Sequence, residues 1–281
     1  MLKQRIITAL VLLAILVPVV LYHDSRLFAL VALVLISAAG WEFGRLAGQE
    51  QVGALGTGGF CFVLGGVLWG VGALQMPWGT WWWVGAAFWV LFSVWVLRQG
   101  ASAWLAVPQV LRVVGGIFAL LVAWLAVSQA HGMGVNYLFS VLFLVWAADV
   151  GAYFFGRSLG GKLIRRKLAP SVSPGKTWEG AIGGLLTVFL VAALWQLVEG
   201  QGSAAELSLY ARLSGHGHVF YAGALLFLVA MSVVGDLVES LLKRSAGVKD
   251  SSSLLPGHGG VLDRVDALLP VLPIAMMLGT M

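Results

Sequence analysis

Residues 240–266 read SLLKRSAGVKDSSSLLPGHGGVLDRVD, and the rest of the chain is organised around this charged stretch. Apolar segments flank it on both sides, at residues 219–234 and 267–278. Charged side chains are costly to place near hydrocarbon, so such a stretch between two apolar segments is a candidate functional site. Its basic residues suit phosphates, and its carboxylates suit a hard metal ion. We therefore interpret it as a loop at a membrane surface that binds a metal ion and a chain of phosphates.

The composition of the whole chain is that of a polytopic membrane protein. Of the 281 residues, 60% are hydrophobic and 10% are charged, whereas soluble domains carry about 25% charged residues. A helix of about 20 apolar residues crosses the hydrocarbon core, so the length allows at most about ten spans. The net charge of +5 is explained by basic residues that set topology and meet anionic headgroups, without nucleic acid as a partner. The single cysteine, Cys61, excludes an intrachain disulfide.

The hydropathy pattern predicts an all-α fold with about nine transmembrane helices in a single membrane domain, residues 1–281. Residues 1–134 supply N-terminal helices, and residues 135–281 supply helices together with the cytosolic loops that carry the site. The basic start resembles a signal peptide, but no small-residue cleavage site follows, which favours an uncleaved first helix. The predicted spans are residues 5–22, 27–44, 53–74, 79–97, 107–129, 135–156, 179–198, 219–242 and 263–280.

The distribution of lysine and arginine orients these spans. With the N-terminus in the cytosol, the outside segments contain only Arg26 and Arg212. Because basic residues concentrate on the cytosolic side, this orientation places the loops at residues 157–178 and 243–262 on the same cytosolic face. The inside segments hold Lys3, Arg5, Arg45, Arg98, Arg157, Lys162, Arg165, Arg166, Lys167, Lys176, Lys243, Arg244, Lys249 and Arg264.

Asp236 lies inside the eighth predicted span, about two turns or roughly 9–10 Å from its cytosolic end. An ionisable residue at that depth is a functional residue by default. Helical spacing places Ser240 and Lys243 on the same face as Asp236, and Glu239 forms an i, i+4 pair with Lys243. The structural alternative is an internal ion pair that only neutralises the end of the helix.

Asp263 and Asp266 begin the ninth predicted span three residues apart, so both carboxylates project from the same side. Like charges this close repel unless a cation or a proton lies between them, and carboxylate oxygens suit Mg²⁺ better than zinc. Asp236 on the preceding span is able to complete such a site, whereas Arg264 points elsewhere, toward phosphate or headgroups. Capping of a helix N-terminus is an alternative that explains Asp263 alone.

The connection between the last two predicted spans supplies cations and glycines. Lys243, Arg244 and Lys249 neutralise phosphate, and the following glycines let backbone amides approach a ligand closely. His258 lies among these glycines, and its role stays open between phosphate donor, general acid or base, and turn-stabilising residue. The P-loop pattern is absent.

A second polar loop, residues 157–178, precedes the seventh predicted span. Ser173 and Lys176 lie just before a helix N-terminus, which favours anions. Asp149 is a further carboxylate within a span. Ser173 also has a structural alternative, because together with Glu179 it is able to cap the following helix. The loop is therefore a candidate second half of the site.

The charged stretch carries a family resemblance. It resembles the signature of the phosphatidate cytidylyltransferases, the CDP-diacylglycerol synthases. Residues 173–180, SPGKTWEG, and the opening MLKQR are also similar to that family, and the resemblance is strongest over about residues 145–281. The matching positions are Ser240-x-x-Lys243-Arg244-x4-Lys249-Asp250-x5-Pro256-x-His258-Gly259-Gly260-x-x-Asp263-Arg264-x-Asp266.

The resemblance implies a reaction in which CTP and phosphatidate give CDP-diacylglycerol and pyrophosphate. It also implies an integral membrane homodimer in the bacterial inner membrane, with Mg²⁺ as cofactor and a monovalent cation such as K⁺ as an additional expectation. The family's metal-binding aspartates correspond here to Asp236, Asp263 and Asp266. The expected catalytic residues are these three with Lys243 and Lys249, and the expected substrate-binding residues are Ser173, Lys176, Ser240, Arg244, His258, Arg264 and Asp149.

Two other functions were weighed against this one. A CTP-using polyprenol or dolichol kinase would transfer the γ-phosphate to an alcohol, and its products, lipid phosphate and CDP, would distinguish it. A cation transporter would carry polar residues through several depths of the membrane. In this sequence the carboxylates gather toward one side, beside basic loops that favour anionic ligands, which argues against transport.

Overall fold

The computed structural model describes residues 2–22, 24–200 and 207–281, which are mostly helical. Within these ranges, seven helical segments are long and apolar enough to cross a membrane. The prediction of an all-α polytopic membrane protein is thereby confirmed. The seven are α2 (Ser25–Leu46), α3 (Gln51–Gly70), α4 (Trp82–Ala106) with the preceding 3-10 turn η1 (Gly79–Trp81), α5 (Gln109–Gly132), α6 (Val135–Leu159), α7 (Trp178–Glu199) and α9 (His218–Ser245).

The predicted count of nine spans is not confirmed, because the apolar part of the first helix and the last helix are both shorter than these seven. In α1 (Leu2–Leu21), the apolar helical part is Ile6–Leu21. Residues 263–280 are divided between the short helix α10 (Leu262–Val265) and α11 (Leu268–Gly279). A helix of 12 residues such as α11 reaches about 18 Å, well short of a hydrocarbon core of about 30 Å. Almost all of its side chains are buried, so α11 is a core helix.

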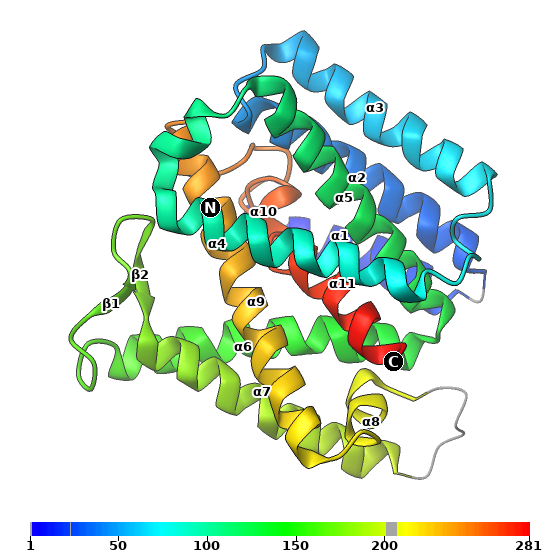
Figure 1. Cartoon of the computed structure of the whole chain (residues 1–281), viewed down its shortest axis with the longest axis vertical. Helices are drawn as coiled ribbons and strands as arrows, with labels where there is room; N and C mark the ends of the chain where they lie inside the picture. Colours follow the sequence, from blue (N-terminus) through cyan, green and yellow to red (C-terminus); the bar gives the residue numbers. More distant parts are fainter. Residues whose placement is uncertain (1, 23, 201–206) are drawn as a thin grey trace.

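The loop between α6 and α7 is an antiparallel hairpin. β1 (Lys167–Ala169) pairs with β2 (Ser173–Thr177), and Figure 1 shows the hairpin projecting at one end of the α6–α7 pair. Thr177 ends the hairpin and caps α7, since its hydroxyl accepts a hydrogen bond from the Gly180 amide at 3.1 Å. The capping role considered for Ser173 therefore belongs to Thr177.

Glycines let α6 and α7 approach each other closely, as the two adjacent helices in Figure 1 show. A Cβ added at Gly180 would lie 2.9 Å from the carbonyl oxygen of Ala152, and one added at Gly184 would lie 2.7 Å from that of Ala148. These distances leave no room for a side chain, which is typical of a Gly-x-x-x-Gly pair at a close helix contact. The contact holds Asp149 of α6 beside the start of α7, where both line one cavity.

Replacing Gly184 with leucine is expected to force α6 and α7 apart. The new side chain would meet backbone, which cannot move away by a change of rotamer, and overpacking of this kind costs about 1–3 kcal/mol. We expect the midpoint of thermal unfolding in detergent to fall by roughly 2–10 °C. Gly66→Leu on α3 is the matched control, because an added Cβ there meets no atom within 4 Å. Equal midpoints for the two variants would show that the close contact does not depend on Gly184.

α9 crosses the α6–α7 pair and packs against both α4 and α11 (Figure 1). Gly235 of α9 allows the start of α11 to come close. A Cβ added at Gly235 would lie 2.6 Å from the carbonyl oxygen of Asp266 and 2.8 Å from Pro270. The two predicted aspartate positions, Asp236 on α9 and Asp266 after α10, are therefore carried by chain segments in direct contact.

Candidate active site

An ion pair joins the hairpin to α9. Lys176 on β2 lies 2.7 Å from Oδ2 of Asp236, and its ammonium also donates to the carbonyl of Val233 at 3.3 Å. Ser240, one turn further along α9, donates to Oδ1 of Asp236 at 3.2 Å. The side chains of Lys176 and Asp236 are 23% and 37% exposed, so a ligand is able to reach the pair. The structure thus brings the hairpin loop into direct contact with the helix that leads into the charged stretch.

This ion pair lines a cavity of about 320 Å³, here called the polar cavity because Asp149, Lys176 and Asp236 line it among mostly apolar side chains. The walls of the cavity come from α6, the hairpin, the start of α7 and α9. Asp149 and Asp236 both line it and lie close enough for their charges to interact, while Lys176 compensates part of that negative charge. A concave site with a few converging charged groups is the usual form of a small-ligand site.

A second and more buried cluster surrounds Lys243. Its ammonium forms ion pairs with Glu239 and with Oδ1 of Asp263, the latter at 2.6 Å. The pairing of Glu239 with Lys243 that the sequence spacing predicted is confirmed. The side chains of Lys243 and Asp263 are only 13% and 5% exposed. Two carboxylates therefore share one ammonium.

Asp263 also organises the loop that precedes it. Its Oδ2 accepts hydrogen bonds from the amide and hydroxyl of Ser251 at 2.9 and 2.8 Å and from the Gly260 amide at 2.7 Å. Asp263 lies outside the seven membrane-length helices. Burial raises its pKa, but the hydrogen bonds from Lys243, Gly260 and Ser251 outweigh burial and lower the pKa to about 2. The carboxylate is therefore ionised at neutral pH.

Glu42 is a site residue that the sequence analysis missed. It lies in α2, its side chain is fully buried, and both of its oxygens accept hydrogen bonds from the segment that follows α9. The donors are the Ser252 hydroxyl at 2.5 Å and the amides of Val261 and Leu262 at 3.0 and 2.7 Å. The signal was available, because Glu42 is an ionisable residue inside a predicted span, the same criterion that identified Asp236.

Glu179 anchors the loop between α6 and α7, as Glu42 anchors the segment that follows α9. Its Oε1 accepts hydrogen bonds from the amides of Gly161, Leu163 and Ile164 at 3.0, 3.1 and 2.8 Å. The carboxylate at the start of α7 therefore fixes the chain that leaves α6. The capping role considered for Glu179 is replaced by this contact with a neighbouring loop.

Asp266 interacts electrostatically with charged groups of both clusters. It follows α10, and its charge interacts with those of Asp236, Asp149 and Lys243. Its Oδ1 accepts a hydrogen bond from the Ala267 amide at 2.8 Å. Asp266 therefore adds a third carboxylate to the pair formed by Asp149 and Asp236.

The other predicted substrate-binding residues lie on the hairpin, at the end of α9 and on the segment that follows α9. His258 is partly buried, and its backbone amide donates to the carbonyl of Leu255 at 2.8 Å. Ser173 on β2 is also partly buried. Three cations are exposed, where a ligand arriving from solvent would meet them, and they are Arg244, Lys249 and Arg264.

The predicted metal-binding aspartates differ in their surroundings. Among the described residues, no group of three or more His, Cys, Asp and Glu side chains is arranged to hold a metal ion. Both oxygens of Asp263 already accept hydrogen bonds from protein donors. Asp236 is partly exposed in the polar cavity, and Asp266 is close to it. Both oxygens of Asp236 are likewise contacted, by Ser240 and Lys176, so hydrogen bonding does not distinguish it from Asp263. Carboxylate oxygens suit Mg²⁺, and metal binding by all three aspartates stays a prediction.

The fold and the site together define an integral membrane protein whose charged, ligand-accessible site is built where two loops meet one central helix. Asp149, Lys176 and Asp236 line the polar cavity there, and Lys243 is paired with Asp263 further along the same helix. Such a site is suited to ligands that carry phosphate groups and a divalent cation.

The chain belongs to the cytidylyltransferase family, which it matches over residues 3–281, and it is therefore an enzyme. It is 38% identical over 276 residues to the phosphatidate cytidylyltransferase of Pseudomonas aeruginosa, an alignment that covers 98% of this chain and 95% of that relative. Identity to the enzyme of the same name is 44% over 160 residues in Haemophilus influenzae (57% of this chain, 50% of the relative) and 42% over 145 residues in Bacillus subtilis (52% and 48%). The family resemblance of the charged stretch is confirmed.

Proposed function

We propose that the protein transfers the cytidylyl group of CTP to phosphatidate, giving CDP-diacylglycerol and pyrophosphate. The names of its relatives support this substrate pair. The observation that carries the proposal is the ion pair between Lys176 and Asp236, because it joins the hairpin loop to α9 beside a cavity that is able to accept a charged ligand. A site of this kind is able to bind a nucleotide from solution and the phosphate of a membrane lipid at the same time.

In the proposed reaction, an oxygen of the phosphatidate phosphate forms a bond to the α-phosphorus of CTP. The bond from that phosphorus to the oxygen bridging to the β-phosphate breaks, and pyrophosphate leaves with the electron pair. The nucleophile needs no general base, because a phosphate monoester with a second pKa near 6 is largely ionised at neutral pH. The protein's task is therefore to position two anions and to stabilise the charge on the leaving group.

Lys176 and Lys243 are the cations best placed for this task. Each is held by carboxylates, Lys176 by Asp236 and Lys243 by Asp263, which fixes the direction of its ammonium group before substrate arrives. Preorganised charge of this kind stabilises a transition state without further rearrangement. We assign Lys176 and Ser240 to binding in the polar cavity and Lys243 to the phosphates at its edge.

The exposed residues complete the proposed binding site. Arg244, Lys249 and Arg264 attract and bind the phosphates of CTP and phosphatidate, because cations at a loop surface favour anions. Asp149 is a further wall of the polar cavity. Ser173 and His258 are assigned to hydrogen bonds with substrate.

Mg²⁺ is the proposed cofactor, with K⁺ as a further cation. Asp236 and Asp266 would hold Mg²⁺, because their charges interact with each other beside the polar cavity and Lys176 compensates only part of the negative charge. When bound, the ion offsets charge on the phosphates and on the leaving pyrophosphate. Lys176 limits the repulsion between these carboxylates by its contact with Asp236.

The proposed setting is the bacterial inner membrane, with the hairpin and the charged stretch facing the cytosol and the protein forming a homodimer. The bacterial relatives and the seven membrane-length helices of the described chain support an inner-membrane enzyme. The cytosolic orientation follows from the concentration of lysine and arginine in these loops. CTP then arrives from solution while phosphatidate arrives sideways from the lipid.

Removal of the divalent cation tests the proposed activity directly. Purified protein in detergent, given CTP, phosphatidate and Mg²⁺, should yield CDP-diacylglycerol and pyrophosphate, measured by mass spectrometry and by a coupled phosphate assay. Addition of EDTA should reduce product to background, and excess Mg²⁺ should restore it. Ca²⁺ in place of Mg²⁺ is the matched control, since its longer, more flexible coordination fits the reaction poorly. No CDP-lipid in the presence of Mg²⁺ would exclude the proposal.

A further inference from the structure

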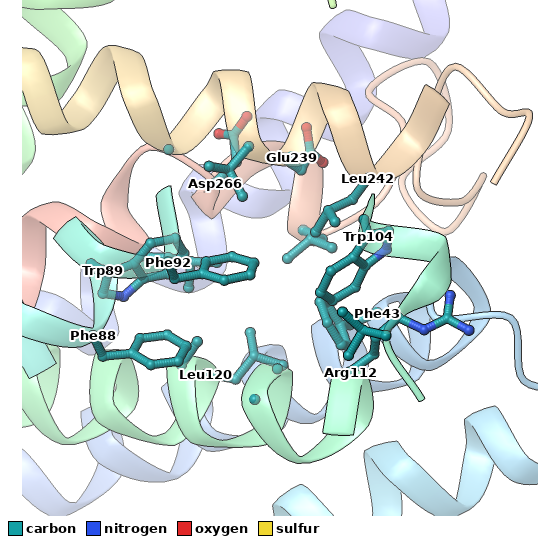
Figure 2. A pocket seen from close by; sticks show the side chains of 18 of the residues that line it. Phe43, Phe88, Trp89, Phe92, Trp104, Arg112, Leu120, Glu239, Leu242 and Asp266 are labelled. Atoms are coloured by element: carbon teal, nitrogen blue, oxygen red, sulfur yellow. The ribbon is translucent and has the colours of Figure 1, made fainter. Parts of the chain in front are cut away.

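An apolar cavity of about 190 Å³ lies next to the site, between α4, α5 and α9. Figure 2 shows its aromatic walls, with Phe88, Trp89 and Phe92 on one side and Trp104 on the other. Leu120 of α5 lies on the face opposite α9 (Figure 2). The lining is almost entirely apolar, so the cavity does not suit a nucleotide or a metal ion.

A break in α4 shapes this cavity. Gly100 has φ 80° and ψ −174°, which divides α4 into a long and a short limb. A positive φ of this size is accessible to glycine and strained for other residues. Phe88 and Phe92 line the cavity from the long limb, and Trp104 lines it from the short limb. Without the break, Trp104 would continue along the helix and would not turn toward the same space.

The cavity lies directly against the carboxylates of the site. Gly235, Glu239 and Asp266 form part of its wall. In Figure 2 the carboxylate groups of Glu239 and Asp266 point away from the aromatic side chains. Asp236, which follows Gly235, lines the polar cavity instead. The same segment of α9 therefore separates a polar space from an apolar one.

We propose that this apolar cavity holds an acyl chain of the lipid substrate. The inference rests on the proposed function, because it names the place of one part of phosphatidate. Asp266 lines the apolar cavity itself, so a lipid whose phosphate is bound near Asp266 has these apolar walls beside it for one of its chains. Leu111 and Trp95, at 59% and 38% exposure on membrane-length helices, line its outer part, where a chain would enter from the bilayer.

Shape decides what the cavity selects. A chain leaves one apolar environment for another when it moves from lipid to protein, so hydrophobicity provides little net gain. The aromatic walls fix the length and path of the bound chain, because interiors tolerate added volume poorly. Filling the cavity should therefore discriminate against long chains and leave short chains unaffected.

Gly115→Leu is the sharpest test. Gly115 lines the cavity, and an added Cβ there meets no atom within 4 Å, so a larger side chain fills space without striking backbone. We expect the KM for dioleoyl-phosphatidate to rise about tenfold, while the KM for CTP and the kcat with dihexanoyl-phosphatidate stay at wild-type values. Gly115→Ala should shift the long-chain KM in the same direction by less. Gly66→Leu on α3 is the control and should change none of these constants.

The possible results distinguish failure of the acyl-chain site from failure of the proposed function. An unchanged ratio of long-chain to short-chain KM in folded Gly115→Leu would overturn the acyl-chain site, and so would an equal loss with both substrates. Wild-type protein that makes no CDP-lipid from either phosphatidate would instead overturn the proposed function. A second measurement needs no variant: a phosphatidate with a diazirine in its acyl chain should label peptides that contain residues 88–104. Labelling confined to α3 and α7 would contradict the site.

Discussion

Asp236→Asn is expected to lower the rate of CDP-diacylglycerol formation by roughly 10²–10³-fold, the effect of removing one preorganised electrostatic contact. The substitution keeps the size and shape of the side chain but removes its charge. Lys176 then loses the ion pair at 2.7 Å that directs it into the polar cavity. Steady-state rates with saturating CTP and phosphatidate measure the loss, and the thermal midpoint in detergent shows that the protein stays folded.

The control for charge alone is Glu50→Gln. Glu50 is exposed before α3, and its side chain does not cap that helix. This variant should keep the wild-type rate. Near-wild-type activity in folded Asp236→Asn would exclude a role of the ion pair in the reaction, and with it the proposed position of the site.

Glu42→Ala should reduce activity by at least about 10²-fold, because the loop before α10 loses its anchor in α2. Three close donors from Ser252, Val261 and Leu262 would be left in a buried space without their acceptor. Each buried and unsatisfied group costs about 1–3 kcal/mol, so the loop should leave its position. Limited proteolysis with trypsin should cut faster at the exposed Lys249, which reports the loop directly.

Glu42→Gln separates positioning from general destabilisation. Glutamine keeps one acceptor oxygen, so we expect partial recovery of kcat, to within about tenfold of wild type, with trypsin resistance largely restored. A KM for CTP that rises in the alanine variant and returns in the glutamine variant would match loss of loop position. Full activity of Glu42→Ala would contradict the anchoring role.

Much of the fold was predictable because lipid imposes a simple rule on sequence. Apolar runs of about 20 residues indicate spans, and the positions of seven membrane-length helices in the described chain agree with the predicted ones within a few residues at most ends. The failure at the C-terminal end has a physical cause. Residues 263–280 are as apolar as a span, but their Pro270 and Pro273 and their burial within the protein fit a short core helix.

The site was predictable where charge stood out against its surroundings. Asp236 and Lys243 appeared as ionisable residues on an apolar helix, and their partners Ser240 and Glu239 followed from helical spacing. The contact of Lys176 with Asp236 could not be predicted in this way, because it depends on how the hairpin folds back on α9. Spacing along one helix carries no information about such a contact.

The apolar cavity and the role of Glu42 were beyond the reach of the sequence for the same reason. Glu42 acts on residues more than 200 positions away, Ser252 among them. The cavity depends partly on Trp104, which follows the positive φ at Gly100 and lies beyond the predicted span 79–97. The sequence placed no element there, so it did not indicate that this segment contributes a wall.

The most direct measurement follows the phosphorus atoms of CTP. Purified protein with Mg²⁺ and phosphatidate is given CTP labelled with ³²P at the α-phosphate in one reaction and at the γ-phosphate in a parallel one, and the lipid fraction is extracted and counted. If the proposed function is correct, α-label enters the lipid as CDP-diacylglycerol, and γ-label leaves as pyrophosphate. Label from the γ-phosphate in the lipid, with CDP as the soluble product, would contradict it and would identify a lipid kinase.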